Sequence, residues 1–187
     1  IETPGGEFVA ADLRILIDDS SLFRHPDFQK RAMEMAEELK PLEMKAREKR
    51  LSYVELDGEI GVIGNGAGLV MATLDMIKHY GGKPANFCDL GGGASAERVS
   101  DAIEVVLSNE KAKVLLVNIL GGITRCDEVA KGILSVRERV GVTKPMVIRL
   151  VGTNDEVGRR MLVEVGIESF DSMENAAEKT VELASKA

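Results

Sequence analysis

The feature that most constrains the fold of this chain is a regular alternation of apolar runs and amphipathic segments from residue 59 onward. The apolar runs cover residues 59–64, 84–90, 112–120, 144–152 and 167–170. Each run precedes a segment with helical periodicity, and these segments cover residues 66–82, 95–109, 124–141, 154–166 and 172–187. Strict strand–helix alternation predicts parallel strands, because a parallel connection has to cross back over the sheet and usually does so as a helix.

Strand–helix units of this length favour an open, doubly wound sheet over a closed barrel. We therefore predict an α/β fold with a five-stranded parallel sheet in the flavodoxin-like order 2-1-3-4-5, where strands are numbered along the chain. Residues 53–187 are expected to form this domain. Helices should cover both faces of the sheet, since its strands are too apolar to face water.

Residues 1–52 have a different pattern. Residues 1–23 alternate apolar and polar side chains around Pro4, Gly5 and Gly6, which predicts a hairpin. A single hairpin is not stable alone in water, so we expect it to belong to a larger domain. Residues 27–49 are rich in Glu, Lys and Arg and are interrupted at Pro41, which predicts a polar helical arm. Because the chain starts at Ile1 and not at Met, we expect it to be part of a longer chain.

The composition excludes several classes of function. The 187 residues are 44% hydrophobic and carry a net charge of -7, which argues against non-specific binding to nucleic acid or to anionic membranes. We see neither a signal peptide nor an apolar run approaching the roughly 20 residues of a membrane span. Cys88 and Cys126 lack a CxxC context, so we interpret them as free thiols in a reducing cytoplasm.

Glycine-rich turns follow the first three predicted strands, at residues 64–69, 89–95 and 121–127. In the predicted strand order, the first and third turns flank the crevice where such sheets bind ligands. Glycines allow close approach, and helix starts offer N–H groups, so a phosphate or dicarboxylate would fit, with help from Asn65 and from Thr124, which could cap its helix. The alternative is that these glycines serve tight turns only, because Leu69 stands where a dinucleotide motif has its third glycine.

Four other polar side chains in the sequence have structural interpretations. We expect Arg125 to form a surface ion pair and Cys126 to be a buried helix residue. His79 falls at the end of a predicted helix, where an imidazole suits the helix dipole, and His25 precedes a proline in a surface segment. None of the four is interpreted as a nucleophile or a catalytic base.

Two long stretches of the sequence resemble, without gaps, the β subunits of the succinyl-CoA synthetase family. They are residues 58–108 and 116–133. The resemblance extends from Tyr53 to the last helix and includes the phrase RLVGTN. Residues 20–28, SSLFRHPDF, resemble the segment that closes the ATP-grasp domain of that family. The resemblance therefore implies that residues 1–52 are the end of an ATP-grasp domain with its connecting arm, and that the chain is the carboxyl-terminal part of a β subunit.

The resemblance also implies an activity, that of an acid–thiol ligase. Members of the family reversibly join succinate and coenzyme A with ATP or GTP, through a phosphohistidine on the partner α subunit. Coenzyme A is expected mainly on the α subunit, and this part of the β subunit alone is expected to be inactive. Two alternatives remain open, namely a related ligase for malate or citrate, and a domain that docks the α subunit without a direct catalytic role.

The resemblance assigns roles to particular residues. Asn65 would contact the dicarboxylate, and Gly122, Ile123 and Thr124 would bind its carboxylate at the α interface, although many relatives have Val where this chain has Thr124. The helix that follows would point its N-terminus at the phosphohistidine. Asp12 falls where the family has a magnesium-binding aspartate, but a lone carboxylate binds a metal poorly, so most of that site is expected outside this chain.

Overall fold

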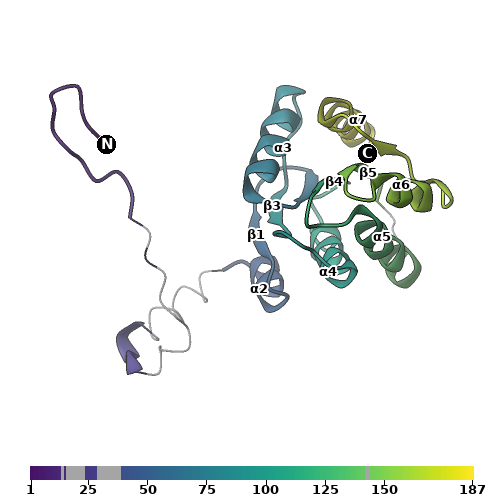
Figure 1. The fold of residues 1–187 in the computed structure, drawn as a ribbon, viewed down its shortest axis with the longest axis horizontal. Helices are drawn as coiled ribbons and strands as arrows, with labels where there is room; N and C mark the ends of the chain where they lie inside the picture. Colours follow the sequence, from purple (N-terminus) through teal and green to yellow (C-terminus); the bar gives the residue numbers. More distant parts are fainter. Residues whose placement is uncertain (14, 16–23, 29–38, 142–143) are drawn as a thin grey trace. The chain divides into compact units, whose positions relative to one another are not determined.

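The computed structural model describes residues 1–13, 15, 24–28, 39–141 and 144–187. The chain divides into two compact units, Ile1–Leu39 and Lys40–Ala187 (Figure 1). The larger unit begins with α2 (Pro41–Glu48), which contacts β1 and α4. The second part of the expected arm is therefore built into the sheet domain, while residues 29–38 of the arm lie outside the described residues.

The smaller unit contains the expected turn at Pro4–Gly6. Glu2 and Phe8 form an antiparallel bridge, and the N–H of Val9 donates to the carbonyl of Ile1 at 2.9 Å. The N–H of Gly6 closes the turn on the carbonyl of Thr3, also at 2.9 Å. These bonds confirm a hairpin over the first nine residues, whereas residues 14 and 16–23 of the expected second half lie outside the described residues.

The sheet of the larger unit has six strands in the order β1-β3-β2-β4-β5-β6. The strands are β1 (Ser52–Glu55), β2 (Ile60–Gly64), β3 (Asn86–Asp89), β4 (Val114–Gly121), β5 (Met146–Gly152) and β6 (Ser169–Phe170). β1 runs antiparallel to β3, and the other neighbouring pairs are parallel. The five parallel strands expected from the sequence do not include β1. The four residues of β1 do not by themselves indicate that they pair, at the edge of the sheet, with a strand about 35 residues later. β2 and β4 lie side by side in the middle of the sheet.

Helices pack on both faces of this sheet. They are α3 (Ala67–His79), α4 (Ala96–Leu107), α5 (Cys126–Val140), α6 (Asp155–Val163) and α7 (Met173–Lys186). α3 and α7 share one apolar cluster with the sheet, and α4, α5 and α6 share the other (Figure 1). In the described part of the chain, no helix is both long enough and apolar enough to cross a membrane.

Local signals in the sequence explain where the helices begin and end. Ser95 caps α4, because its hydroxyl accepts a hydrogen bond from the N–H of Arg98 at 3.3 Å. α5 ends at Gly141, whose φ of 68° suits a residue without a side chain. β4 is buried over its first six residues and opens to solvent only at Leu120 and Gly121. The most apolar run thus forms a central strand whose end is accessible.

A chain of buried polar groups crosses the α3/α7 side of the core. Thr73 and Asn118 are both 0% exposed, and Asn118 Nδ2 donates to the hydroxyl of Thr73 at 2.7 Å. Arg149 Nη1 donates to Asn118 Oδ1 at 2.9 Å, and Arg149 Nε donates to the carbonyl of Asp171 at 2.9 Å. Because both ends of the Asn118 amide have hydrogen-bond partners, this series of hydrogen bonds fixes α3 against β4 and β5 at little cost in desolvation.

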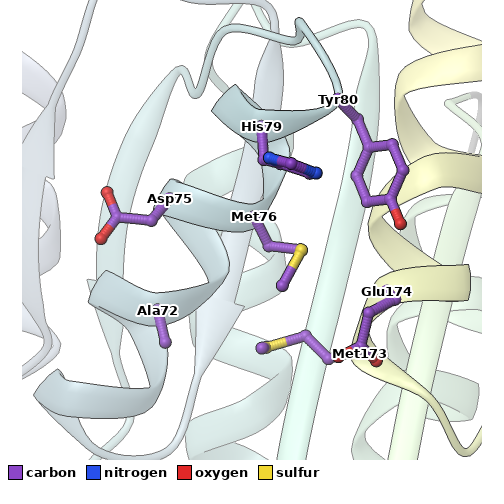
Figure 2. A pocket seen from close by; sticks show the side chains of 7 residues that line it. All are labelled: Ala72, Asp75, Met76, His79, Tyr80, Met173 and Glu174. Atoms are coloured by element: carbon purple, nitrogen blue, oxygen red, sulfur yellow. The ribbon is translucent and has the colours of Figure 1, made fainter.

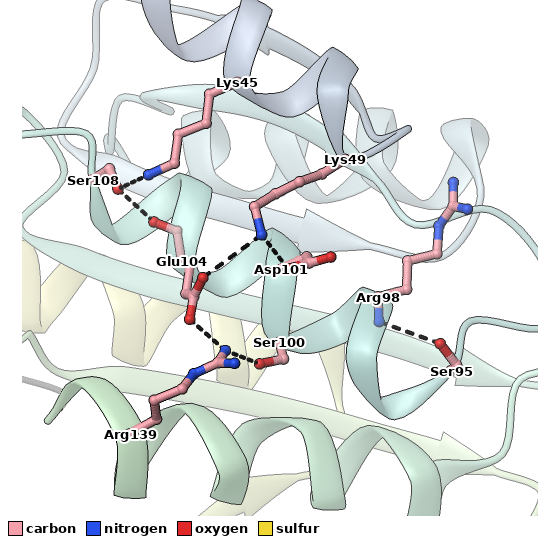
Figure 3. A network of polar contacts seen from close by, with 9 residues as sticks. All are labelled: Lys45, Lys49, Ser95, Arg98, Ser100, Asp101, Glu104, Ser108 and Arg139. Atoms are coloured by element: carbon pink, nitrogen blue, oxygen red, sulfur yellow. Dashed lines mark hydrogen bonds and ion pairs between the residues drawn. The ribbon is translucent and has the colours of Figure 1, made fainter.

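On the side of the sheet opposite α3 and α7, an ionic network holds α2 against α4 (Figure 3). Lys49, just after α2, binds the carboxylate of Asp101 and lies 3.7 Å from that of Glu104, both on α4. Arg139 of α5 pairs with the same Glu104 carboxylate. The hydrogen bond with Asp101 is the main reason that the pKa of Lys49 is raised. Three helices are thus joined through α4.

Candidate functional site

Two glycine-rich turns meet at the carboxyl edge of the sheet. One follows β2 and contains Asn65, and the other follows β4, which is the neighbouring parallel strand. Asn65 Nδ2 donates to the carbonyl of Leu120 at 2.8 Å, and Asn65 Oδ1 accepts from the N–H of Leu120 at 2.9 Å. The first and third turns, which the sequence predicted to flank one crevice, are therefore in direct contact.

Asn65 plays a structural part that the sequence did not reveal. Its side-chain amide pairs with Leu120 as a peptide group would, and so it extends the ladder between β2 and β4 beyond Gly64. An Asn amide has two N–H donors, and the pairing with Leu120 uses one of them. The second N–H of Asn65 remains as a donor at the half-buried edge of the site.

The turn after β4 carries main-chain donors without partners. In the described part of the chain, the N–H groups of Gly122, Ile123 and Thr124 donate to no other group. Gly122 and Ile123 are exposed, and the Ile123 side chain at the tip is 87% exposed. The Thr153 hydroxyl supports the turn from β5 by donating to the carbonyl of Gly122 at 3.0 Å. Gly122 and Ile123 thus present consecutive exposed N–H groups, a pattern that suits an anion, whereas Thr124 is buried.

Thr124 does not cap the following helix, and this sequence expectation was wrong. Helix α5 begins at Cys126 with Arg125 as its N-cap residue, and the N–H of Cys126 donates to the carbonyl of Thr153 at 2.9 Å. The Thr124 hydroxyl instead accepts from the N–H of Gly93 at 3.0 Å, and Thr124 is 1% exposed. The loop after β3 approaches the turn closely, so the Thr124 hydroxyl forms its hydrogen bond inside the protein. No pattern among the neighbouring residues predicts this contact.

Asp89, at the end of β3, was not among the residues singled out from the sequence. Its Oδ1 accepts from the N–H of Gly66 at 2.6 Å and from the N–H of Gly91 at 2.7 Å. One oxygen therefore connects the turn after β2 with the loop after β3. An aspartate at a strand end, two residues before a run of glycines, was the signal that could have identified it.

The charges beside the β4–α5 turn largely cancel each other. Arg125 Nη2 lies 2.9 Å from Asp127 Oδ2, which confirms the expected ion pair. The hydrogen bond from Arg125, supported by one from Asn154, lowers the pKa of Asp127 to about 2. Arg125 is thus committed to Asp127, and the turn offers a ligand mainly its main-chain N–H groups.

A comparison with known protein families decides the classification of the chain. Residues 63–183 match the model of the CoA-ligase family, a range that runs from the end of β2 into α7 and includes helices on both faces of the sheet. The chain belongs to the CoA-ligase family. The matched residues include both turns that form the candidate site.

Curated relatives of this CoA-ligase chain carry one name. A protein of Staphylothermus marinus named succinate–CoA ligase (ADP-forming) subunit beta is 54% identical over 184 residues, which are 98% of this chain and 48% of that protein. A protein of the same name from Pyrobaculum calidifontis is 50% identical over 183 residues, 97% of this chain and 48% of that protein. The chain therefore spans about half the length of the curated relatives it matches.

Solved structures support the fold of the CoA-ligase domain. ATP citrate lyase from Methanothrix soehngenii, in complex with citrate and coenzyme A, superposes with a TM-score of 0.70 at 18% identity and covers 89% of this chain and 52% of that chain. The dinucleotide-forming acetyl-coenzyme A synthetase 1 of Ca. Korarchaeum cryptofilum, with phosphate and ADP, gives a TM-score of 0.59 at 18% identity, over 71% and 34% of the two chains. At these identities the likeness concerns the fold alone.

The described residues of this CoA-ligase chain do not form a magnesium site by themselves. Asp12, the residue expected to bind magnesium, accepts a hydrogen bond from the N–H of Leu13 at 2.7 Å. Across the described residues, no group of three His, Cys, Asp or Glu side chains gathers to hold a metal ion. Magnesium requires octahedral oxygen coordination, which one carboxylate cannot supply.

A recess elsewhere in the CoA-ligase domain is separate from the glycine turns. It has a volume of about 560 Å³, and His79 and Met76 of α3 face Met173 and Glu174 of α7 across it (Figure 2). His79 is exposed and contacts the Tyr80 ring edge-on, with ring centroids 5.3 Å apart, in line with the structural interpretation of this histidine. None of the residues that line the recess lies in the turns after β2, β3 or β4.

Both cysteines are free, as the sequence predicted, and both are buried, which had been expected for Cys126. Burial raises the pKa of Cys88 to about 12 and that of Cys126 to about 11. The thiolate is the reactive form of cysteine, so these pKa values make both side chains poor nucleophiles near neutral pH. Cys126, although it opens α5 beside the candidate site, therefore contributes packing and not chemistry.

Proposed function

We propose that this chain is the carboxyl-terminal part of the β subunit of a succinate–CoA ligase, in which it binds the dicarboxylate and the α subunit. The whole enzyme would catalyse the reversible conversion of succinate, coenzyme A and ATP or GTP into succinyl-CoA, the nucleoside diphosphate and phosphate. The names of the relatives, which are ADP-forming ligases, support ATP as the nucleotide.

The observation that carries this proposal is the pair of exposed N–H groups at Gly122 and Ile123, which have no partner in the described part of the chain, next to the Asn65 amide. Main-chain donors in consecutive positions suit a carboxylate, which accepts several hydrogen bonds at once. We assign one carboxylate of the acid to these donors and a further contact to the second N–H of Asn65. The exposed Ile123 side chain at the tip of the turn would lie against the α subunit.

The same turn also suits a phosphoryl group. Helix α5 begins directly after it, and the N-terminus of a helix carries about half a positive charge. A phosphohistidine on the α subunit would bring its phosphoryl group to this point, where the helix dipole would stabilise negative charge during transfer to the acid. The residues of this chain would hold the acid in place for that transfer and exclude water from it.

The other parts of the reaction belong outside this chain. We assign residues 1–39 to the end of an ATP-grasp domain with part of its connecting arm, and residues 40–187, which form one compact unit, to a flavodoxin-like ligase domain that begins before the expected residue 53. Phe8 and Leu13 in the first part are 84% and 80% exposed, as expected for a domain edge whose packing partner is missing. Magnesium and the nucleotide would bind that other domain, coenzyme A would bind mainly the α subunit, and the assembly would be cytoplasmic.

The test of the proposed function uses the full-length β subunit in complex with its α subunit. The complex is assayed with succinate, malate and citrate, once with the wild-type sequence and once with Asn65→Ala. We expect turnover of succinate, and a loss of about 10- to 100-fold in kcat/KM on removal of the Asn65 amide, because the acid loses both a contact and its positioning. Asn175→Ala, an exposed asparagine of α7, is the matched control and should leave the rate unchanged.

The same assay separates the two alternatives. Turnover of malate or citrate in place of succinate would assign the chain to a related ligase. An Asn65→Ala complex that assembles with α and keeps the wild-type rate would instead indicate an α-docking domain without a direct catalytic role. Co-purification of the α subunit with each variant shows whether a loss of rate reflects chemistry or assembly.

A further inference from the structure

The carboxylate of Asp89 lies between the turn after β2 and the loop after β3. Asp89 is the last residue of β3 and pairs with Gly64 of β2 in the parallel register. Its Oδ1 receives the N–H of Gly66 at 2.6 Å and the N–H of Gly91 at 2.7 Å. Hydrogen bonds of this length to a charged oxygen are among the stronger ones in proteins, so both loops are held firmly.

Both N–H groups belong to glycines in left-handed conformations. Gly66 has a φ of 117° and Gly91 a φ of 71°. Such glycines are conformationally free in the absence of a restraint, because they lack a side chain that would limit φ and ψ. Gly66 is also the N-cap residue of α3 and has no side chain with which to cap it. Asp89 therefore holds the N-cap residue of α3 through that residue's own N–H, from a neighbouring strand.

The position of Asn65 depends on this restraint. Asn65 stands between Gly64, which is paired in the sheet, and Gly66, which is held by Asp89. Its side chain is attached to Leu120 through two hydrogen bonds. If the Gly66 N–H bond were lost, Gly66 would keep the hydrogen bond from the N–H of Val70 to its carbonyl at 3.0 Å but would lose its restraint on the side of Asn65, and the remaining N–H of the Asn65 amide would be less fixed in direction.

We propose that Asp89 is a positioning residue of the dicarboxylate site, which holds Asn65 in its binding orientation. The proposal rests on the proposed function. Asp89 does not touch the acid, and it acts through Gly66 and Gly91 on the turn that contains Asn65.

The test compares Asp89→Ala and Asp89→Asn in the full-length β subunit complexed with α. Asn keeps an oxygen that accepts both hydrogen bonds, whereas Ala removes it. We expect Asp89→Ala to lower kcat/KM for succinate by about 10- to 100-fold, while KM for coenzyme A and for the nucleotide stays unchanged. We expect Asp89→Asn to remain within about threefold of the wild type, because the geometry survives with weaker hydrogen bonds. Asp57→Ala, whose carboxylate is fully solvated on the surface, is the matched control.

Amide hydrogen exchange gives a second readout that does not depend on activity. Exchange at Gly66 and Gly91 should accelerate in Asp89→Ala and remain slow in Asp89→Asn and Asp57→Ala. Wild-type kinetics in Asp89→Ala, equal damage from Ala and Asn, or a parallel loss of coenzyme A and nucleotide binding would each overturn the proposal. If the wild-type complex does not act on succinate, the proposed function fails, and unchanged exchange at the two glycines would then overturn the positioning role separately.

Discussion

The turn after β2 and the turn after β4 look alike in sequence and differ in use. Both join a buried central strand to a helix through glycines, and they contact each other through Asn65 and Leu120. In the first turn, the N–H of Gly66 is taken by Asp89, and the Asn65 side chain is committed to Leu120. In the second, consecutive N–H groups stand open, and Ile123 projects into solvent.

The difference shows that a glycine-rich turn can bind a ligand only through those N–H donors that have no partner inside the protein. In the first turn, the N–H of Gly66 and one N–H of the Asn65 amide form internal contacts that hold this edge of the sheet in place. In the second turn, the exposed N–H groups of Gly122 and Ile123 have no partner in the described part of the chain.

The largest loss of stability should come from adding a side chain at Gly152, which packs against the main chain of Gly121 at the β4–α5 turn. A Cβ atom at Gly152, where φ is 113°, would lie 2.0 Å from the carbonyl oxygen of Gly121. We expect Gly152→Ala to destabilise the protein by about 3 kcal/mol or more, since backbone has to move and the residue is strained. Urea unfolding measures the change. At Gly122 a Cβ would meet nothing within 4 Å, so Gly122→Ala should stay within about 1 kcal/mol of the wild type. If the two variants were equally stable, the close packing of Gly152 against Gly121 would not be what holds the turn in place.

The turn after β2 should be more tolerant. At Gly66 a Cβ would meet nothing within 4 Å, but φ is 117°, so Gly66→Ala brings backbone strain without a clash. We expect a loss of about 1–2 kcal/mol in unfolding free energy. Gly68→Ala, in the first turn of α3 with open space around it, is the control and should stabilise by up to about 1 kcal/mol. A larger loss in Gly66→Ala than in Gly152→Ala would reverse the comparison between the turns.

A pH experiment tests the charge balance beside the β4–α5 turn. Arg125 lowers the pKa of Asp127 to about 2, below the unfolded value of about 3.9. A lowered pKa means that this stabilisation is present in full above about pH 4 and is lost as the pH falls toward 2. In Arg125→Met we expect the pKa of Asp127 to rise toward its ordinary value, as followed by carboxyl NMR. Glu182, whose pKa is also about 2 because of Lys186 and Lys179, should not change. An unchanged pKa of Asp127 would show that Arg125 does not neutralise it.

The smallest effect should appear far from both turns, in the network of Figure 3. Lys49→Met removes the contacts with Asp101 and Glu104, but these groups are partly exposed. We expect a loss below about 1 kcal/mol, which shrinks further in high salt, because water and ions screen such pairs. Thermal unfolding at two salt concentrations measures it, with Lys179→Met in the exposed pair with Glu182 as control. A loss as large as that of Gly152→Ala would mean that α2 stabilises the whole domain.

Much of the fold could be predicted because its signals are local. The apolar runs that became β2, β4 and β5, the cap at Ser95 and the helix end at Gly141 each depend on residues close together in the chain. The site could be predicted in part, since the strand order brings the turns after the first and third predicted strands together. Strand β1 was missed, and Thr124 was assigned to the wrong contact, because both depend on partners distant in sequence.

The sequence by itself determined where strands alternate with helices and where glycines allow the chain to turn, since periodicity and backbone freedom are properties of neighbouring residues. Only the tertiary structure decided which donors remain free. Asp89 reaches Gly66 across 23 residues, and Asn65 reaches Leu120 across 55. A hydrogen bond forms wherever the fold brings two polar groups within about 3 Å, whatever their distance along the chain.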